Sequence, residues 1–79
     1  MDRETLELAR VIHIARLKDC YIKGEAYNAA MARQPFPPVD SKEFRKLHHD
    51  GQSWIEIAIA QARAVQTYFK ERRQSDGNT

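Results

Sequence analysis

Apolar residues in the first third of the chain recur at intervals of three and four positions, with charged residues between them. Leu8 and Ile12 share one helical face, while Leu6 and Leu17 belong to a second apolar stripe. Two apolar stripes on one helix indicate that neighbours cover it on more than one side. The spacing therefore predicts one long, largely buried helix over residues 2–33.

Two features interrupt this pattern. Gly24 weakens a helix by about 1 kcal/mol relative to alanine and marks either a kink or a close helix contact. Three prolines then stand within residues 35–38. Proline lacks the amide hydrogen that a helix requires, and it pushes the preceding residue toward an extended conformation. We therefore predict a connector over residues 34–40, with Phe36 tucked against the helices.

Two capping boxes organise the second half of the chain, one starting at Asp40 and the other at Ser53. Between them lies a turn dipeptide that contains Gly51. Two interpretations stay open: one continuous helix with a tolerated glycine, or a short helix over 41–49 followed by a main helix over 53–73. The coincidence of a turn with a new cap favours the second interpretation.

The main helix has an apolar stripe that runs over its whole length. Its members are Ile55, Ala58, Ile59, Ala62, Val65 and Phe69. We assign Phe44 and Phe69 to the core. The sequence predicts an all-α fold, a hairpin of two long helices in one domain over 1–73, with a flexible tail over 74–79. Because two helices cannot cover all of the apolar stripes, we expect a homodimer that forms a four-helix bundle.

Composition narrows the class of protein. The chain has 79 residues, with 13 Lys and Arg against 11 Asp and Glu, a formal net charge of +2 and a single cysteine, Cys20. This length allows one small domain, and one cysteine cannot form a disulfide within the chain. The charged N-terminus does not resemble a signal peptide, and no apolar run is long enough for a membrane span. We therefore expect a cytoplasmic protein without a membrane anchor.

Candidate chemistry is sparse. His48 and His49, followed by Asp50, suggest a small metal or acid–base centre, but adjacent helical residues point about 100° apart. A polar helix end explains them better. His13 stands between two isoleucines, which indicates a packed or interface histidine with both ring nitrogens hydrogen-bonded. We predict no catalytic residue, no metal, no cofactor and no enzymatic activity.

The middle of the chain resembles the ribosome modulation factor family of small bacterial and phage-borne proteins. The residues concerned are Gly24, Ala26, Tyr27 and Ala30, then Pro35-Phe36-Pro37, then Phe44 to Leu47 with Asp50-Gly51, and finally Trp54. The resemblance covers residues 21–60, and the Gly-Trp step of the family is here interrupted by two residues. It implies two helices joined by a proline connector, and binding to the ribosome.

Two functions follow as hypotheses. Amphipathic helices with nearly balanced charge favour a small interaction protein that binds and regulates or inhibits another protein, a type that phage and accessory genes often encode. The partner-binding residues predicted for it are Tyr27, Arg33, Phe36, Arg45, Lys46, Trp54 and Tyr68. The alternative is ribosome or RNA binding. Its phosphate contacts are predicted at Lys42, Arg45, Lys46, Arg72 and Arg73.

Overall fold

The computed structural model describes residues 2–20 and 24–77. The described residues form four helices and no strand, which confirms the predicted all-α class for this part of the chain. In chain order the helices are α1 (Arg3–Cys20), α2 (Gly24–Arg33), α3 (Lys42–His49) and α4 (Ser53–Gly77).

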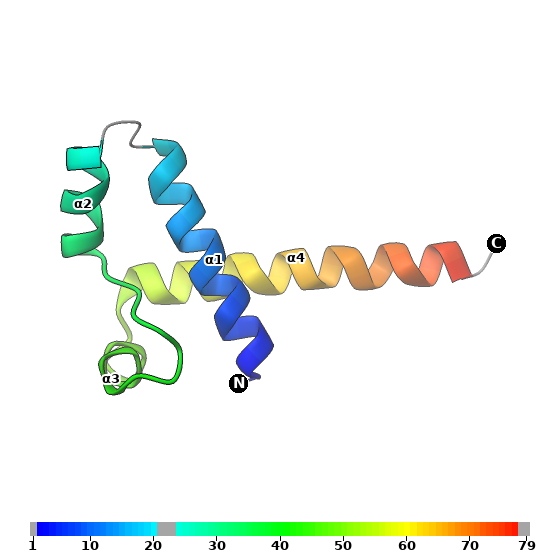
Figure 1. The fold of residues 1–79 in the computed structure, drawn as a ribbon. Helices are drawn as coiled ribbons and strands as arrows, with labels where there is room; N and C mark the ends of the chain where they lie inside the picture. Colours follow the sequence, from blue (N-terminus) through cyan, green and yellow to red (C-terminus); the bar gives the residue numbers. More distant parts are fainter. Residues whose placement is uncertain (1, 21–23, 78–79) are drawn as a thin grey trace.

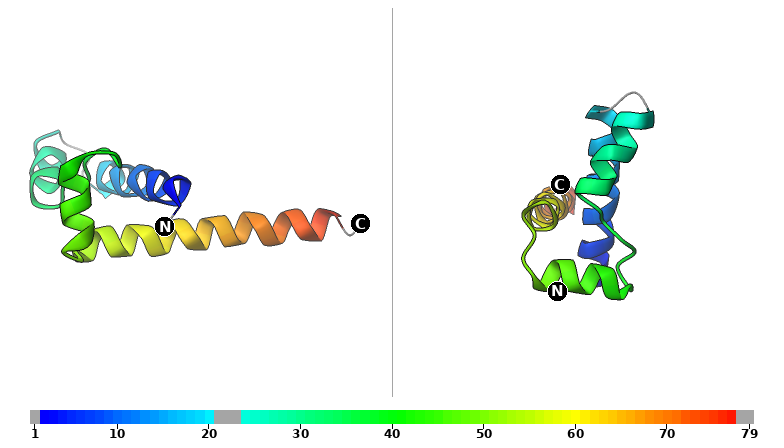
Figure 2. Two further views of the ribbon diagram at one scale, coloured as in Figure 1. Left: turned by 90° about the horizontal axis from the view of Figure 1, so that it is seen from below. Right: turned by 90° about the vertical axis from the view of Figure 1, so that its left-hand side faces the viewer.

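α4 is the longest helix, and the others gather around its first half (Figure 1). α1 crosses α4 and packs against it, α2 lies against α1, and α3 contacts α4 near its start. The second half of α4 extends beyond these helices, and the left-hand view of Figure 2 shows the same overhang. A helical segment of fewer than about 12–15 residues without tertiary contacts is marginally stable in water. The overhanging half of α4 is therefore a surface that another polypeptide could stabilise.

The predicted single helix over residues 2–33 is wrong, because two helices occupy this region. α1 ends at Cys20, and α2 begins at Gly24 and lies back against α1 (Figure 1). Glycine has the lowest helix propensity of any residue except proline, and α2 begins at such a residue, Gly24. Ala30 of α2 is 2% exposed, so one face of this short helix is buried.

Residues 34–41 join α2 to α3 and contain the three prolines. The hydroxyl of Ser41 caps α3 by accepting a hydrogen bond from the Phe44 amide at 3.1 Å. α3 ends at His49, and Gly51 adopts a positive φ of 70° before α4 begins. The helical second half of the chain is therefore interrupted at Gly51. This agrees with the second interpretation of the sequence, a short helix followed by a main helix.

The last helix is longer than the sequence predicts. α4 continues to Gly77, four residues beyond the predicted end at 73, so residues 74–77 belong to its last turn. Residues 78 and 79 of the predicted tail lie outside the described part of the chain.

Gly51 provides a first test of this fold. Replacement by alanine is expected to lower the free energy of unfolding by about 1 kcal/mol, because an L side chain is strained at positive φ. No atom stands within 4 Å of the position that the new Cβ would occupy, so the strain comes from the backbone alone. Urea denaturation at a fixed protein concentration measures the change. Gly51→Asn is the control, since asparagine tolerates this conformation better, and an alanine variant at least as stable as wild type would contradict the assignment.

The core lies where the connector, α3 and the first half of α4 meet α1. Its buried residues are Ala9, Phe36, Phe44, Ile55, Ala58, Ile59 and Ala62. Phe36 stacks on Phe44 with ring centroids 5.2 Å apart and contacts the ring of His13 at 5.6 Å. The indole Nε1 of Trp54 donates a hydrogen bond to the Pro35 carbonyl at 2.9 Å, which fastens the connector to α4.

The assignments of the two phenylalanines to the core have opposite outcomes. Phe44 is 2% exposed, which confirms its predicted place in the core. Phe69 is 55% exposed, so its assignment is wrong. It shares a stripe with Ile55 and Ile59, but α1 covers only the earlier part of that stripe.

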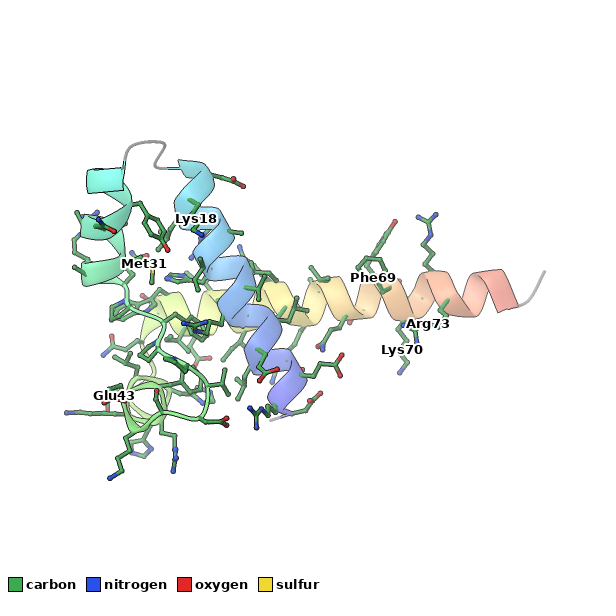
Figure 3. All side chains as sticks on the ribbon, viewed as in Figure 1. Lys18, Met31, Glu43, Phe69, Lys70 and Arg73 are labelled. Carbon is green, nitrogen blue, oxygen red and sulfur yellow. The ribbon has the colours of Figure 1, made fainter. Side chains whose placement is uncertain are left out.

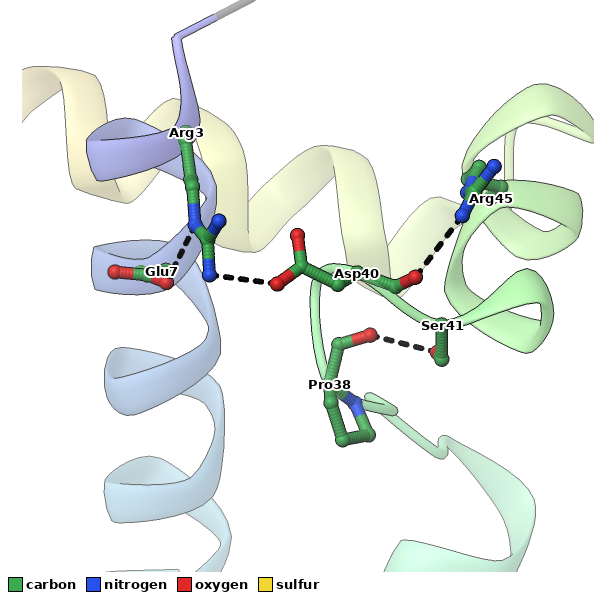
Figure 4. A network of polar contacts seen from close by, with 6 residues as sticks. All are labelled: Arg3, Glu7, Pro38, Asp40, Ser41 and Arg45. Atoms are coloured by element: carbon green, nitrogen blue, oxygen red, sulfur yellow. Dashed lines mark hydrogen bonds and ion pairs between the residues drawn. The ribbon is translucent and has the colours of Figure 1, made fainter.

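A polar network on the surface joins the N-terminus of α1 to the start of α3 (Figure 4). The Arg3 guanidinium contacts the Glu7 carboxylate at 3.0 Å and the Asp40 carboxylate at 2.6 Å. Arg45 donates to the Asp40 carbonyl at 3.0 Å, and the Ser41 hydroxyl donates to the Pro38 carbonyl at 2.6 Å. These exposed contacts orient the segments, and screening by solvent keeps their contribution to stability small.

Candidate interaction groove

An open groove of about 740 Å³ lies between the N-terminal half of α1 and the overhanging half of α4. Its apolar lining comes from both helices: Leu8 and Val11 on α1, and Val65 and Phe69 on α4. Val11 is 63% exposed and Phe69 55%, so large apolar side chains face solvent on both walls. We call this feature the α1/α4 groove.

The apolar floor of the groove continues the hydrophobic core. Ile55, Ile59 and Ala62 are buried under α1, and the next apolar residues of the same stripe are Val65 and Phe69. A stripe with helical period marks the face of a helix that packs against a neighbour. Along α4 this face therefore runs from a region covered by the chain itself to a region that the described chain leaves open.

Charged residues of opposite sign frame the two walls. Glu4 and Glu7 line the α1 wall, and Lys70 and Arg73 line the α4 wall. Figure 3 shows Phe69, Lys70 and Arg73 on the part of α4 that extends beyond α1. The carboxylate of Glu7 is held by Arg3 of the same helix, and none of the ion pairs of the described residues joins the two walls.

The predicted partner-binding residues do not form one surface. Phe36 is 1% exposed and belongs to the core, so its predicted role as a surface contact is wrong. Trp54 is half-buried, with its indole nitrogen engaged by Pro35. Tyr27 lies on α2, where the Lys18 ammonium stands 5.8 Å from the centre of its ring.

The remaining members of this set are exposed on three different helices. They are Arg33 at the end of α2, Arg45 and Lys46 on α3, and Tyr68 on α4. Only Tyr68 lies next to the α1/α4 groove, with its ring edge-on to that of Phe69 at 5.4 Å between centroids.

The residues predicted for RNA binding separate into two groups. Lys42, Arg45 and Lys46 are exposed on α3, whereas Arg72 and Arg73 are near the far end of α4. Arg72 donates a hydrogen bond to the Tyr68 hydroxyl at 3.0 Å, and Arg73 lines the α1/α4 groove. Because α3 and the end of α4 lie at opposite ends of the molecule, the five residues do not form one basic stripe (Figure 1).

The sequence-based choice of interface residues missed the two walls of the groove. Val65 and Phe69 were recognisable as members of one stripe, but the periodicity does not show where its covering helix ends. Glu4 resembles an ordinary first-turn acid, which suits the helix dipole, and Glu7 resembles an ordinary surface charge one turn later. Only the crossing of α1 over α4 brings them opposite Lys70 and Arg73.

His13 is fully buried, and both of its ring nitrogens are hydrogen-bonded, as the sequence predicts. Nε2 donates to the Gln34 carbonyl at 2.8 Å, and Nδ1 accepts from the Arg16 guanidinium at 3.0 Å. Since a carbonyl only accepts and a guanidinium only donates, these partners select the neutral Nε2–H tautomer. Burial lowers the pKa of His13 from 6.5, and the nearby Arg16 charge lowers it further.

In the described part of the chain, no three His, Cys, Asp or Glu side chains come together as a metal site. His48 instead stacks on Phe44 at 5.5 Å between ring centroids, and His49 is exposed at the end of α3.

None of the described helices is both long and apolar enough to cross a bilayer.

Comparison of the chain with protein-family models, with curated proteins and with solved structures finds no match. The resemblance to the ribosome modulation factor family therefore stays a prediction from the sequence.

Proposed function

We propose that this chain is a small non-enzymatic interaction protein that binds a helix of another polypeptide in the α1/α4 groove and regulates or inhibits a partner protein in this way. Recognition of an amphipathic helix by an apolar groove is a recurrent mode of protein binding, with anchors spaced three and four residues apart. A partner helix that occupies the groove is withheld from its other contacts, and this is the physical basis of the proposed regulation.

The observation that supports this proposal most directly is the continuation of the core stripe of α4 into solvent. Ile55 and Ile59 are buried, yet Phe69, on the same stripe, is 55% exposed beside the equally open Val11. Single exposed apolar residues are common on proteins, but a contiguous groove lined from two helices and rimmed by charges is typical of an interaction site.

Capture experiments with matched variants test the role of the groove. Tagged wild-type protein, Phe69→Glu and Ile57→Glu are each incubated with lysate of the native host, with and without nuclease and high salt. Ile57 is the control because it is 50% exposed on the same helix and lies outside the groove lining. We expect a partner protein that wild type and Ile57→Glu retain, that Phe69→Glu loses, and that nuclease does not release.

Two outcomes would contradict this function. Retention of the same partner by Phe69→Glu would remove the groove from the interaction. Loss of all bound protein on nuclease treatment would place an RNA between the chain and its apparent partners. Circular dichroism of each variant shows whether its helices are intact.

A second candidate function, RNA or ribosome binding, is favoured by the basic face of α3. Lys42, Arg45 and Lys46 are all exposed within this helix of eight residues. Binding through phosphate contacts must weaken steeply with salt, because each neutralised phosphate releases counterions. We therefore expect a charge-reversed Lys42→Glu/Lys46→Glu variant to lose RNA affinity if this candidate is correct. An affinity that does not change between low and high salt would exclude it.

A further inference from the structure

We infer that the α1/α4 groove accepts the overhanging half of α4 from a second copy of this chain, in an antiparallel and symmetric dimer. The inference rests on the proposed function, because it names the polypeptide that fills the same groove. In such a dimer α1 and α4 of each copy form a four-helix cluster, and each α4 covers the exposed stripe of the other. A partner protein that uses the groove then competes with the second copy.

The occupant of the groove must satisfy its apolar floor. A suitable helix presents large apolar residues four positions apart, and the overhanging half of α4 has this pattern in Val65 and Phe69. In a two-fold dimer the same patch serves on both copies, so a groove that is complementary to one of its own walls is the feature required. The overhang leaves room for this approach, since no other described helix lies along it (Figures 1 and 2).

The charges that meet in the dimer depend on where α1 lies along α4 and on the centre of the pair, which we place at the exposed Phe69. The Thr5 hydroxyl donates to the Gln66 side-chain oxygen at 3.0 Å, which fixes the first turn of α1 beside this point of α4. In an antiparallel pair of α4 helices centred on Phe69, residue 73 of one copy faces residue 65 of the other. Arg73 of the second copy is thereby brought to the first two turns of α1.

The charges of the two walls favour this antiparallel arrangement. The first two turns of α1 contain Glu4 and Glu7, both on the groove wall. The second copy brings Lys70 and Arg73 to that wall, so each α1 gains two opposite charges from the partner α4. A parallel arrangement instead places the two basic helix ends side by side, which is unfavourable. The charge pattern therefore selects both the partner and its direction.

Sedimentation equilibrium or light scattering tests the dimer directly. We expect wild-type protein and the control Ile57→Glu to be dimeric at about 100 µM, where even a micromolar Kd keeps most chains paired. Phe69→Glu is expected to raise the dimer Kd by at least about tenfold, because it places a charge in the centre of the interface. Far-ultraviolet circular dichroism of both variants at the same concentration excludes the possibility that loss of the dimer merely reports an unfolded chain.

Charge reversal distinguishes this antiparallel dimer from any other self-association. The variant Glu4→Lys/Glu7→Lys makes both walls basic, and the variant Lys70→Glu/Arg73→Glu makes both walls acidic. Each alone is expected to dimerise at least about tenfold more weakly than wild type, and an equimolar mixture is expected to form a heterodimer of near wild-type affinity. Both contacts of the mixed dimer join opposite charges, which is not so in either homodimer.

The possible results separate this inference from the proposed function. Wild-type protein that is monomeric at about 100 µM overturns the dimer, and so does a mixture of the two charge-reversed variants that associates no better than either alone. Neither result affects the capture experiment, in which a partner lost by Phe69→Glu supports the function even for a monomer. Conversely, a dimer that dissociates in Phe69→Glu while no partner is captured supports the inference and leaves the regulatory function without support.

Discussion

Replacement of Phe36 by alanine is expected to lower the free energy of unfolding by about 3–5 kcal/mol. Phe36 is 1% exposed and belongs to the core, where it stacks on Phe44 and contacts the tilted ring of His13. Truncation removes its ring from all of these contacts and leaves a cavity that the prolines beside it cannot close, because their backbone is stiff. A domain of this size has a total stability of only about 4–12 kcal/mol, so the variant is expected to lose a large share of its stability and to unfold at a much lower temperature than wild type.

Thermal and urea denaturation followed by circular dichroism measure this effect, at one protein concentration because self-association would shift the midpoint. Ile57→Ala is the control, since it removes apolar atoms from a side chain that is already 50% exposed. We expect this control to change stability by less than about 0.5 kcal/mol. A Phe36→Ala variant that unfolds within about 1 kcal/mol of wild type would mean that the connector does not pack as described.

The local features of the second half of the chain were predictable because each depends on neighbouring residues. The Ser41 cap determines where α3 begins, and the turn at Gly51 separates α3 from α4. Both features lie within a few residues of the helix ends concerned. The second cap predicted at Ser53 is not seen, because Ser53 is already the first residue of α4. Phe44 and His13 were likewise predictable, since an apolar ring and a histidine between isoleucines have few favourable places besides a packed interior.

The features that escaped prediction depend on long-range packing. The periodicity of residues 2–33 fits one helix as well as two, and only the packing of α2 against α1 shows that the chain reverses. Phe69 belongs to the same stripe as Ile59, but a stripe does not record how far its covering helix reaches. Phe36 was expected both against the helices and in the interface, and its ring can occupy only the first of these places.

The groove illustrates the same limit for function. Its four charged residues come from opposite ends of the chain, Glu4 and Glu7 near the start, and Lys70 and Arg73 near the end. No spacing rule connects residues so far apart in the sequence. The acidic and basic residues face each other across the groove because α1 crosses α4. Small buried residues, Ala9 on α1 and Ala58 and Ala62 on α4, let the two helices approach.

His13 is expected to make the fold less stable in acid. Its neutral form donates to Gln34 and accepts from Arg16, whereas the protonated form has a second N–H that points at the Arg16 guanidinium. Protonation therefore replaces a hydrogen bond with a repulsion between two cations in a buried position. Burial, and to a lesser extent the Arg16 charge, hold the pKa of His13 in the folded chain below its ordinary value of 6.5.

The direction of the pH effect follows from this lowered pKa. Well above pH 6.5, His13 is neutral in both states and the fold has its full stability. As the pH falls through 6.5, the unfolded chain takes up a proton before the folded chain does, so stability is lost progressively until the pH passes the lowered pKa of the folded state. Urea denaturation between about pH 7.5 and about pH 5.5 covers the onset of this loss before most carboxylates titrate.

Two variants isolate the contribution of His13 to the pH dependence. His13→Gln is expected to be less stable than wild type at neutral pH, because its amide can replace Nε2 toward Gln34 but places no acceptor at the Nδ1 position that Arg16 binds. It is expected to show a flatter pH dependence in this interval. His49→Gln, which changes an exposed histidine, is expected to keep the wild-type slope. If His13→Gln instead retains the wild-type slope, the acid sensitivity arises elsewhere. If wild type shows no loss of stability at all, His13 is not held neutral by Gln34 and Arg16 in solution.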